Sequence, residues 1–108
     1  MKNDRIHVTA RCPIRTTLEM VGGKWKLLIL RQLYGGPLRL SALRSTIPDI
    51  SEKMLIQELK ILVENRLVHR ENFGEVPPRV AYSLTDRGEL VKPLIEEMIA
   101  FAERYERT

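Results

Sequence analysis

Glycine and proline breaks are the strongest constraint on this fold, because they leave room only for short elements in the first half of the chain. Gly22-Gly23 and Gly35-Gly36-Pro37 interrupt the apolar periodicity, and Pro48 biases Ile47 away from helical backbone. The intervals between the breaks predict helices over residues 13–21, 24–34 and 41–46, the last capped by Ser41, and a brief extended piece at 38–40. We expect the core side of the second helix to carry Trp25, Leu28, Ile29 and Leu33.

The longest segment with helical periodicity runs from Ser51 to Asn65. Ser51 is a good N-cap, and Asn65 is expected to end the helix in the left-handed conformation. At about 100° per residue, one arc of this helix is apolar and holds Leu55, Leu59, Leu62 and Val63. The opposite side is an unbroken polar stripe of Lys53, Gln57, Lys60 and Glu64. Glu58 lies near the apolar arc, so we expect it to pair with a basic neighbour.

Two apolar-aromatic runs follow this helix, at residues 67–73 and 80–84, and they predict two strands. The loop between them, Gly74 to Pro78, is too long for a tight hairpin. Thr85 is expected to cap one final helix that runs close to the C-terminus, and Pro93 inside it is expected to bend the helix or break one hydrogen bond. This order predicts a mostly α protein with a small β-ribbon (α+β). Two helices joined by a short turn and followed by a hairpin form a winged helix-turn-helix.

Length and composition limit the other classes. The 108 residues suit one domain, so residues 1–108 are interpreted as a single winged helix-turn-helix domain with a flexible arm at 1–11. A single cysteine excludes an internal disulfide and a cysteine-rich zinc site. Apolar runs such as Leu27 to Leu30 are far shorter than a bilayer span, and no secretory core follows the N-terminus. We expect a soluble cytoplasmic protein without membrane contact, metal or cofactor.

Charge is distributed unevenly along the chain. The formal net charge is +4. Residues 1–70 hold 13 basic and 6 acidic side chains, whereas residues 71–108 hold 5 basic and 8 acidic ones. A basic first two-thirds indicates that a surface facing a polyanion lies before the acidic tail.

In the second helix of a helix-turn-helix, an exposed polar stripe is placed to enter the major groove of double-stranded DNA. Gln57 can pair with an adenine edge, Lys53 can reach guanine or a phosphate, and Lys60 lies where it would contact the backbone. Arg79 directly follows Pro77-Pro78, which stiffen the loop, and is placed to enter a minor groove or hold phosphate. The candidate DNA contacts are Ser51, Lys53, Gln57, Lys60, Arg79, Arg39 and Lys24, with Lys26 as a further phosphate candidate.

Plainer interpretations of the same residues stay open. Every amphipathic helix has a polar face, so the stripe can be a surface that only contacts solvent. Arg79 can simply form a surface ion pair. The competing function is a winged-helix module for protein–protein contact, whose binding to DNA would show no steep salt dependence. Catalysis is not supported, because Cys12 and His7 are the only nucleophile and base near each other in sequence, and His7 lies in the arm that we expect to be flexible. The paired glycines match no nucleotide-binding loop.

Several motifs together resemble the HxlR family, which is related to the MarR-type bacterial regulators. They are Cys12-Pro13-Ile14, Gly23-Lys24-Trp25, Leu38-Arg39-Leu40, Ile50-Ser51-Glu52-Lys53-Met54-Leu55, Pro77-Pro78-Arg79-Val80, Tyr82, Leu84-Thr85 and Gly88. The resemblance covers about residues 12 to 101. It implies a homodimeric winged-helix transcription factor that binds an inverted repeat, with repression as the expected outcome. Asn65-Arg66 departs from the family, which often has a glycine after this helix, but asparagine tolerates left-handed backbone.

The resemblance also implies dimerisation through the terminal helices, over residues 12–21 and 86–107. The candidate interface residues are Ile14, Leu18, Leu94, Met98, Phe101 and Tyr105. The alternative is that some of these side chains fill the core of their own chain. A small-molecule effector is a further candidate partner, and the sequence identifies none.

Cys12 is the candidate redox-sensing residue. Arg11, Arg15 and a helix N-terminus all favour its thiolate, and an accessible thiolate is typical of a redox or electrophile sensor. The resemblance adds that several family members sense redox signals through a cysteine at the corresponding N-terminal position. A single cysteine would require an intersubunit disulfide or a mixed adduct. The alternative is a small, half-buried residue that helps the first helix to dock.

Overall fold

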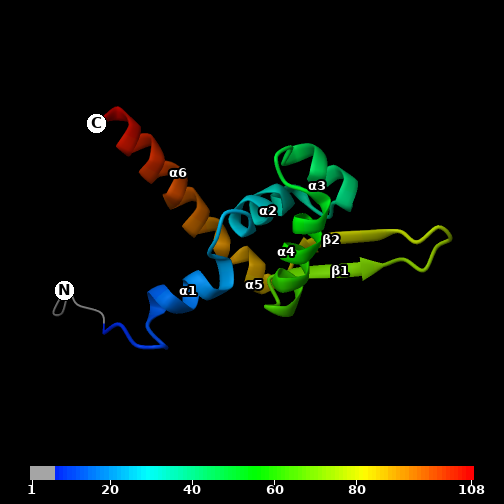
Figure 1. Ribbon diagram of the computed structural model, residues 1–108, viewed down its shortest axis with the longest axis horizontal. Coiled ribbons are helices and arrows are strands. Elements are labelled where there is room, and N and C mark those ends of the chain that lie inside the picture. The colour runs from blue at the N-terminus through cyan, green and yellow to red at the C-terminus, as the bar shows by residue number, and fades with distance from the viewer. Residues whose placement is uncertain (1–6) are drawn as a thin grey trace.

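The structure is a computed structural model that describes residues 7–108, so most of the expected arm at 1–11 lies outside the described residues. The molecule is elongated, with extents of 58 × 34 × 23 Å. Seven helices, counting one 3-10 turn (η1), and two strands make up the described part of the chain (Figure 1). In chain order they are α1 Pro13–Val21, α2 Lys26–Gln32, η1 Leu33–Gly35, α3 Leu40–Thr46, α4 Glu52–Glu64, β1 Val68–Asn72, β2 Val80–Leu84, α5 Asp86–Glu89 and α6 Val91–Arg107. None of these helices is long and apolar enough to cross a membrane.

Side-chain caps start α4 and α5 where the sequence places them. Ser51 Oγ accepts a hydrogen bond from the Met54 N–H at 3.1 Å, which satisfies a free donor in the first turn of α4. Thr85 Oγ1 accepts from the Gly88 N–H at 3.0 Å at the start of α5. The predicted caps at Ser51 and Thr85 are therefore confirmed.

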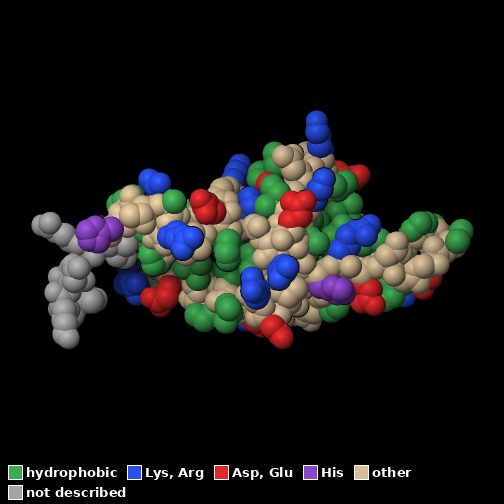
Figure 2. Space-filling model, turned by 90° about the horizontal axis from the view of Figure 1, so that it is seen from below, with side chains coloured by type: hydrophobic (Ala, Val, Ile, Leu, Met, Phe, Trp, Pro, Cys, Tyr) green, Lys and Arg blue, Asp and Glu red, His purple; other side chains and the backbone are tan. Residues whose placement is uncertain are grey.

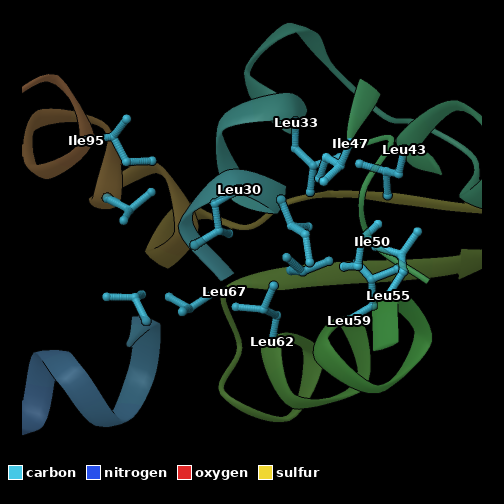
Figure 3. Close-up of a cluster of buried hydrophobic side chains, with 14 residues drawn as sticks. Leu30, Leu33, Leu43, Ile47, Ile50, Leu55, Leu59, Leu62, Leu67 and Ile95 are labelled. Atoms are coloured by element: carbon cyan, nitrogen blue, oxygen red, sulfur yellow. The ribbon is translucent and has the colours of Figure 1, made fainter. Parts of the chain in front are cut away.

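The hydrophobic core is formed where α2, α3 and α4 meet the base of the hairpin (Figure 3). The predicted inward arc of α4 is confirmed, since its leucines are buried and Val63 is half-buried. The prediction for Leu28 is wrong: its side chain is 45% exposed, and the neighbouring Leu30 is fully buried in its place. The helix begins at Lys26 rather than residue 24, and its last turn tightens into η1. Leu28 and Leu30 lie about 100° to either side of Ile29, and the Leu30 side is the one that faces the core.

The two strands form an antiparallel ribbon whose register runs from Val68↔Leu84 to Asn72↔Val80. A third segment joins it as an isolated bridge, because Leu38 and Tyr82 exchange backbone hydrogen bonds of 2.9 and 2.8 Å. The predicted extended piece at 38–40 therefore ties the start of α3 to the hairpin. It also explains why Ser41 is not the cap: the chain turns into α3 at Leu40, with Arg39 in the N-cap position.

The end of α4 differs from the prediction by one residue. Asn65 keeps near-helical backbone (φ −80°), and the left-handed residue is Arg66 (φ 62°). Two backbone hydrogen bonds close the turn, from the Arg66 N–H to Val63 O and from the Leu67 N–H to Leu62 O, both at 3.0 Å. This is a Schellman motif, in which the left-handed position is the residue after the C-cap.

The predicted single terminal helix is divided in two. α5 ends at Glu89, and α6 begins at Val91, with Leu90 between them. Pro93 is the third residue of α6, where a backbone N–H has no partner within the helix. The interruption therefore precedes Pro93, and no bend is needed at the proline itself.

Candidate nucleic-acid interface

A helix-turn-helix is built by α3, the turn at residues 47–50 and α4. Ile47 and Ile50 in this turn are buried at 4% and 2% exposure, so the turn is anchored in the core. Its backbone is closed by hydrogen bonds from the Ile47 N–H to Leu43 O at 3.1 Å and from the Ile50 N–H to Ile47 O at 3.2 Å. The exposed pair Arg44–Glu52, at 3.1 Å, joins the two helices outside the core.

The outer face of α4 carries the polar stripe that the sequence predicts. Lys53, Gln57 and Lys60 are exposed, as is Ser51 at the N-cap. Among the interactions of residues 7–108, these three long side chains have no ion pair and no side-chain hydrogen bond. Their polar groups are therefore available to a partner.

Glu58 is turned away from this face and pairs with Lys26 of α2. The carboxylate and the ammonium group lie 3.0 Å apart, and the two side chains are only 11% and 13% exposed. The expected basic partner of Glu58 is thus identified. We predicted Lys26 as a phosphate contact. Its ammonium group is instead held in this pair and is not free to bind phosphate.

Two weaker candidates lie on the surface near the helix-turn-helix. Lys24 is exposed, with its ammonium group 4.6 Å from the centre of the Trp25 ring. Arg39 is exposed at the N-cap position of α3. Neither is held in an ion pair within the described residues.

The hairpin β1–β2 is the wing, and it projects from the body as a narrow extension (Figures 1 and 2). Near its tip, Arg79 Nη2 lies 3.0 Å from Glu75 Oε2. The same guanidinium group lies over the Phe73 ring, 4.4 Å from its centre. The alternative of a surface ion pair is thus the arrangement seen for Arg79 in the free chain.

A groove of about 490 Å³ separates α4 from the wing. Most of its lining is apolar, and Ile56 of α4 leaves 47% of its side chain exposed there. Sequence reasoning missed Arg70, an exposed cation of β1 that lines the groove together with Lys60. The signal was its position on the polar side of a predicted strand, next to the helix with the polar stripe.

The terminal helices α1 and α6 both expose apolar side chains. α6 extends away from the body at the end opposite the wing (Figure 1). Phe101 and Tyr105 stack with their ring centres 6.3 Å apart. All six candidate interface residues are exposed in the single chain: Ile14 57%, Leu18 60%, Leu94 38%, Met98 46%, Phe101 66% and Tyr105 74%.

Cys12 is not the accessible thiol that we predicted. It is only 5% exposed, and its sulfur caps α1 by accepting from the Arg15 N–H at 3.4 Å. A small side chain is favoured here, because the residue both caps the helix and fills the space beside it. Between residues 7 and 108, no three His, Cys, Asp or Glu side chains are grouped as metal ligands.

Comparison with known proteins agrees with this geometry. The model of the HxlR-like helix-turn-helix family matches residues 20–108. The helix-turn-helix-type transcriptional regulator YkvN of Bacillus subtilis (strain 168) is 45% identical over 94 residues, which cover 87% of this chain and 80% of YkvN.

Two solved structures are similar along most of their length. A protein from Porphyromonas gingivalis W83, described as a MarR-family transcriptional regulator, is 44% identical, with a TM-score of 0.86 over 92% of this chain and 97% of its own. The redox regulator HypR in its reduced form is 35% identical, with a TM-score of 0.82 over 87% of this chain and 93% of its own. The chain therefore belongs to the HxlR-like helix-turn-helix family of transcriptional regulators.

Proposed function

We propose that this protein is a sequence-specific DNA-binding repressor that acts as a homodimer on an inverted-repeat operator. The observation that carries the proposal is the uncommitted polar stripe on α4, the second helix of the helix-turn-helix. An exposed helix of this kind fits the major groove, which is about 12 Å wide. A helix face that only contacts solvent would also be polar. The position of these unpaired side chains beside a projecting wing is what favours DNA binding.

Each side chain of the stripe suits one kind of contact. Gln57 offers an amide that pairs with an adenine edge, and Lys53 reaches guanine acceptors or a phosphate. Lys60, farther along α4, contacts the phosphate backbone of the DNA. Ser51 Oγ accepts from the Met54 N–H, so its own proton remains available for a phosphate at the start of the helix.

The remaining cations hold the DNA backbone in this proposal. Arg79 does so from the wing, and Arg39 and Lys24 do so beside the helix-turn-helix. The excess of basic residues before residue 70 supports this assignment, because phosphate contacts supply most of the affinity of such proteins.

The homodimer forms through α1 and α6, which carry the six exposed apolar residues described above. A two-fold dimer presents two α4 helices to successive major grooves, about 34 Å apart. Cys12 is buried at the start of α1, so its oxidation requires this end of the helix to open, and the opening changes that spacing and releases the operator. The similarity to HypR, which is described as a redox regulator in oxidised and reduced forms, supports this signal.

The test of DNA binding is a gel shift with the region upstream of the protein's own gene at 50 and 200 mM salt. A protein with 6–10 phosphate contacts loses about 10³–10⁵-fold in affinity over this range. We expect Lys53→Ala and Gln57→Ala to weaken binding, whereas Arg107→Ala, which removes a cation at the far end of α6, leaves it unchanged. Binding without salt dependence, or equal effects of all three variants, would favour the protein–protein module.

The test of redox sensing uses diamide. In the intersubunit reaction, two Cys12 thiols lose two protons and two electrons to one diamide molecule and form one disulfide. Cys12→Ser should bind the operator and no longer release it after this treatment. Release of the operator by diamide in Cys12→Ser would rule out Cys12 as the sensor.

A further inference from the structure

The wing ends in a small cluster formed by Phe73, Glu75 and Arg79, which we name the wing clip. The Phe73 N–H donates to Arg79 O at 2.9 Å, so these two residues form the last backbone contact before the loop. Gly74 opens the loop with φ 70°, and its N–H donates to Asn72 Oδ1 at 2.9 Å. The backbone thus brings the Arg79 side chain over the Phe73 ring and within reach of Glu75.

The clip satisfies the Arg79 guanidinium group only in part. Glu75 Oε2 contacts Nη2 at 3.0 Å, and the Phe73 ring covers one face at 4.4 Å. The Nε atom is buried and has no hydrogen-bond partner among the described residues. A guanidinium group has five N–H donors in a fixed fork, so the carboxylate leaves donor capacity unused.

We propose that Glu75 is a built-in competitor for DNA phosphate at the wing. In the free chain its carboxylate holds Arg79 against the body of the hairpin, and a phosphate must displace it before Arg79 grips the duplex. This inference rests on the proposed DNA-binding function and on the wing contact of Arg79.

Phosphate is the stronger partner here, because it can accept two parallel N–H bonds from the freed fork, including the one from Nε, whereas Glu75 makes a single contact of 3.0 Å with Nη2. Glu75 therefore lowers the affinity for DNA below what the cations of the wing would give. In the free chain the Phe73 ring supports the guanidinium group, whose carbon lies 4.4 Å from the ring centre.

The test is a double-mutant cycle on operator affinity with Glu75→Gln, Arg79→Ala and the double variant. An exposed ion pair is a weak competitor, so Glu75→Gln should raise affinity about two- to fivefold per wing. In the Arg79→Ala background the same substitution should have no effect. Glu71→Gln is the matched control, because Glu71 is on the same hairpin, is 57% exposed against 54% for Glu75, and does not contact Arg79.

The outcomes separate this inference from the proposed function. An equal gain in Glu71→Gln, or a gain from Glu75→Gln that persists without Arg79, would show general charge repulsion and overturn the inference. If Arg79→Ala binds like the wild type while Lys53→Ala is weakened, the clip has no role and the proposed function stands. If the wild type does not bind the operator at 50 mM salt, the proposed function and this inference both fail.

Discussion

Glu58 is a buried charged residue whose partner comes from a distant part of the chain. Its carboxylate is 3.0 Å from the Lys26 ammonium group, across 32 positions of sequence. Helical periodicity placed Glu58 beside the apolar arc and so predicted a basic neighbour. It did not identify Lys26, because periodicity describes one helix and not the helix that packs against it.

Removing Glu58 should therefore destabilise the fold. Glu58→Ala leaves the Lys26 charge largely buried without a partner, and we expect a loss of about 3 kcal/mol in the free energy of unfolding. Glu52→Ala, which breaks the exposed pair with Arg44, should cost less than about 1 kcal/mol. Urea unfolding followed by circular dichroism measures both. Similar losses in the two variants would contradict a special role for the buried pair.

Tyr34 should make the stability depend on pH in the alkaline range. Partial burial raises the pKa of Tyr34 above 10.0, and the Glu96 carboxylate adds to this, while Arg31 and Lys92 oppose it. A raised pKa in the folded state means that the tyrosine contributes stability below pH 10, which is lost as the pH rises through the folded value. Tyr34→Phe should therefore lose less stability than the wild type between pH 9 and 11, as measured by urea unfolding. A wild type and variant with parallel pH profiles would contradict this.

At the scale of elements, α5 depends on a close approach to the chain before β1. A Cβ atom on Gly88 would lie 2.1 Å from the carbonyl oxygen of Leu67. Thr85 fixes the same contact, because its N–H donates to Leu67 O at 3.1 Å and its hydroxyl donates to Arg66 O at 2.6 Å. Backbone is on both sides of this contact, so no side chain can move to make room.

Gly88→Ala should therefore separate α5 from the base of the wing, at a cost of about 2 kcal/mol or more. Gly35→Ala is the matched control: a Cβ there meets nothing within 4 Å, and its φ is outside the left-handed range. Thermal unfolding compares the two. Equal melting temperatures would show that the contact at Gly88 relaxes easily.

The sequence predicted elements better than their junctions. Ser51 and Thr85 were identified as caps because a cap is a local interaction, in which a hydroxyl oxygen accepts a hydrogen bond from an N–H a few residues later. The end of α4 was misplaced, since both Asn65 and Arg66 precede the strand and the local pattern does not show which carries the left-handed turn. The break at Leu90 was missed, because leucine is not a helix breaker and the only proline in the segment is Pro93.

The same limit applies to the candidate interface. The stripe of Lys53, Gln57 and Lys60 follows from the period of one helix, and the structure exposes it as expected. The state of Arg79 does not follow from sequence, because its contacts with Glu75 and Phe73 depend on how the loop folds back. Arg70 was missed for a related reason: its relevance comes from a groove between two elements.

At the scale of the whole molecule, α6 and the wing lie at opposite ends (Figure 1). Val91 and Ile95 attach the first turns of α6 to the core, and the rest of the helix carries exposed apolar side chains. An exposed apolar surface of this kind is unfavourable in water and is typical of an interface. A second copy of the chain would cover it and set the distance between the two α4 helices.

The decisive substitution for this arrangement is Phe101→Glu. Phe101 is 66% exposed, so a charge there should leave the single chain folded while preventing a dimer in light scattering after size exclusion. Operator affinity should then fall about 10²–10⁴-fold, because the two half-sites are no longer bound together. Glu103→Ala is the control, since residue 103 lies on the opposite side of α6, about 200° from Phe101. A dimer that persists in Phe101→Glu would place the interface elsewhere. A monomer with unchanged operator affinity would show that DNA recognition does not depend on pairing through α6.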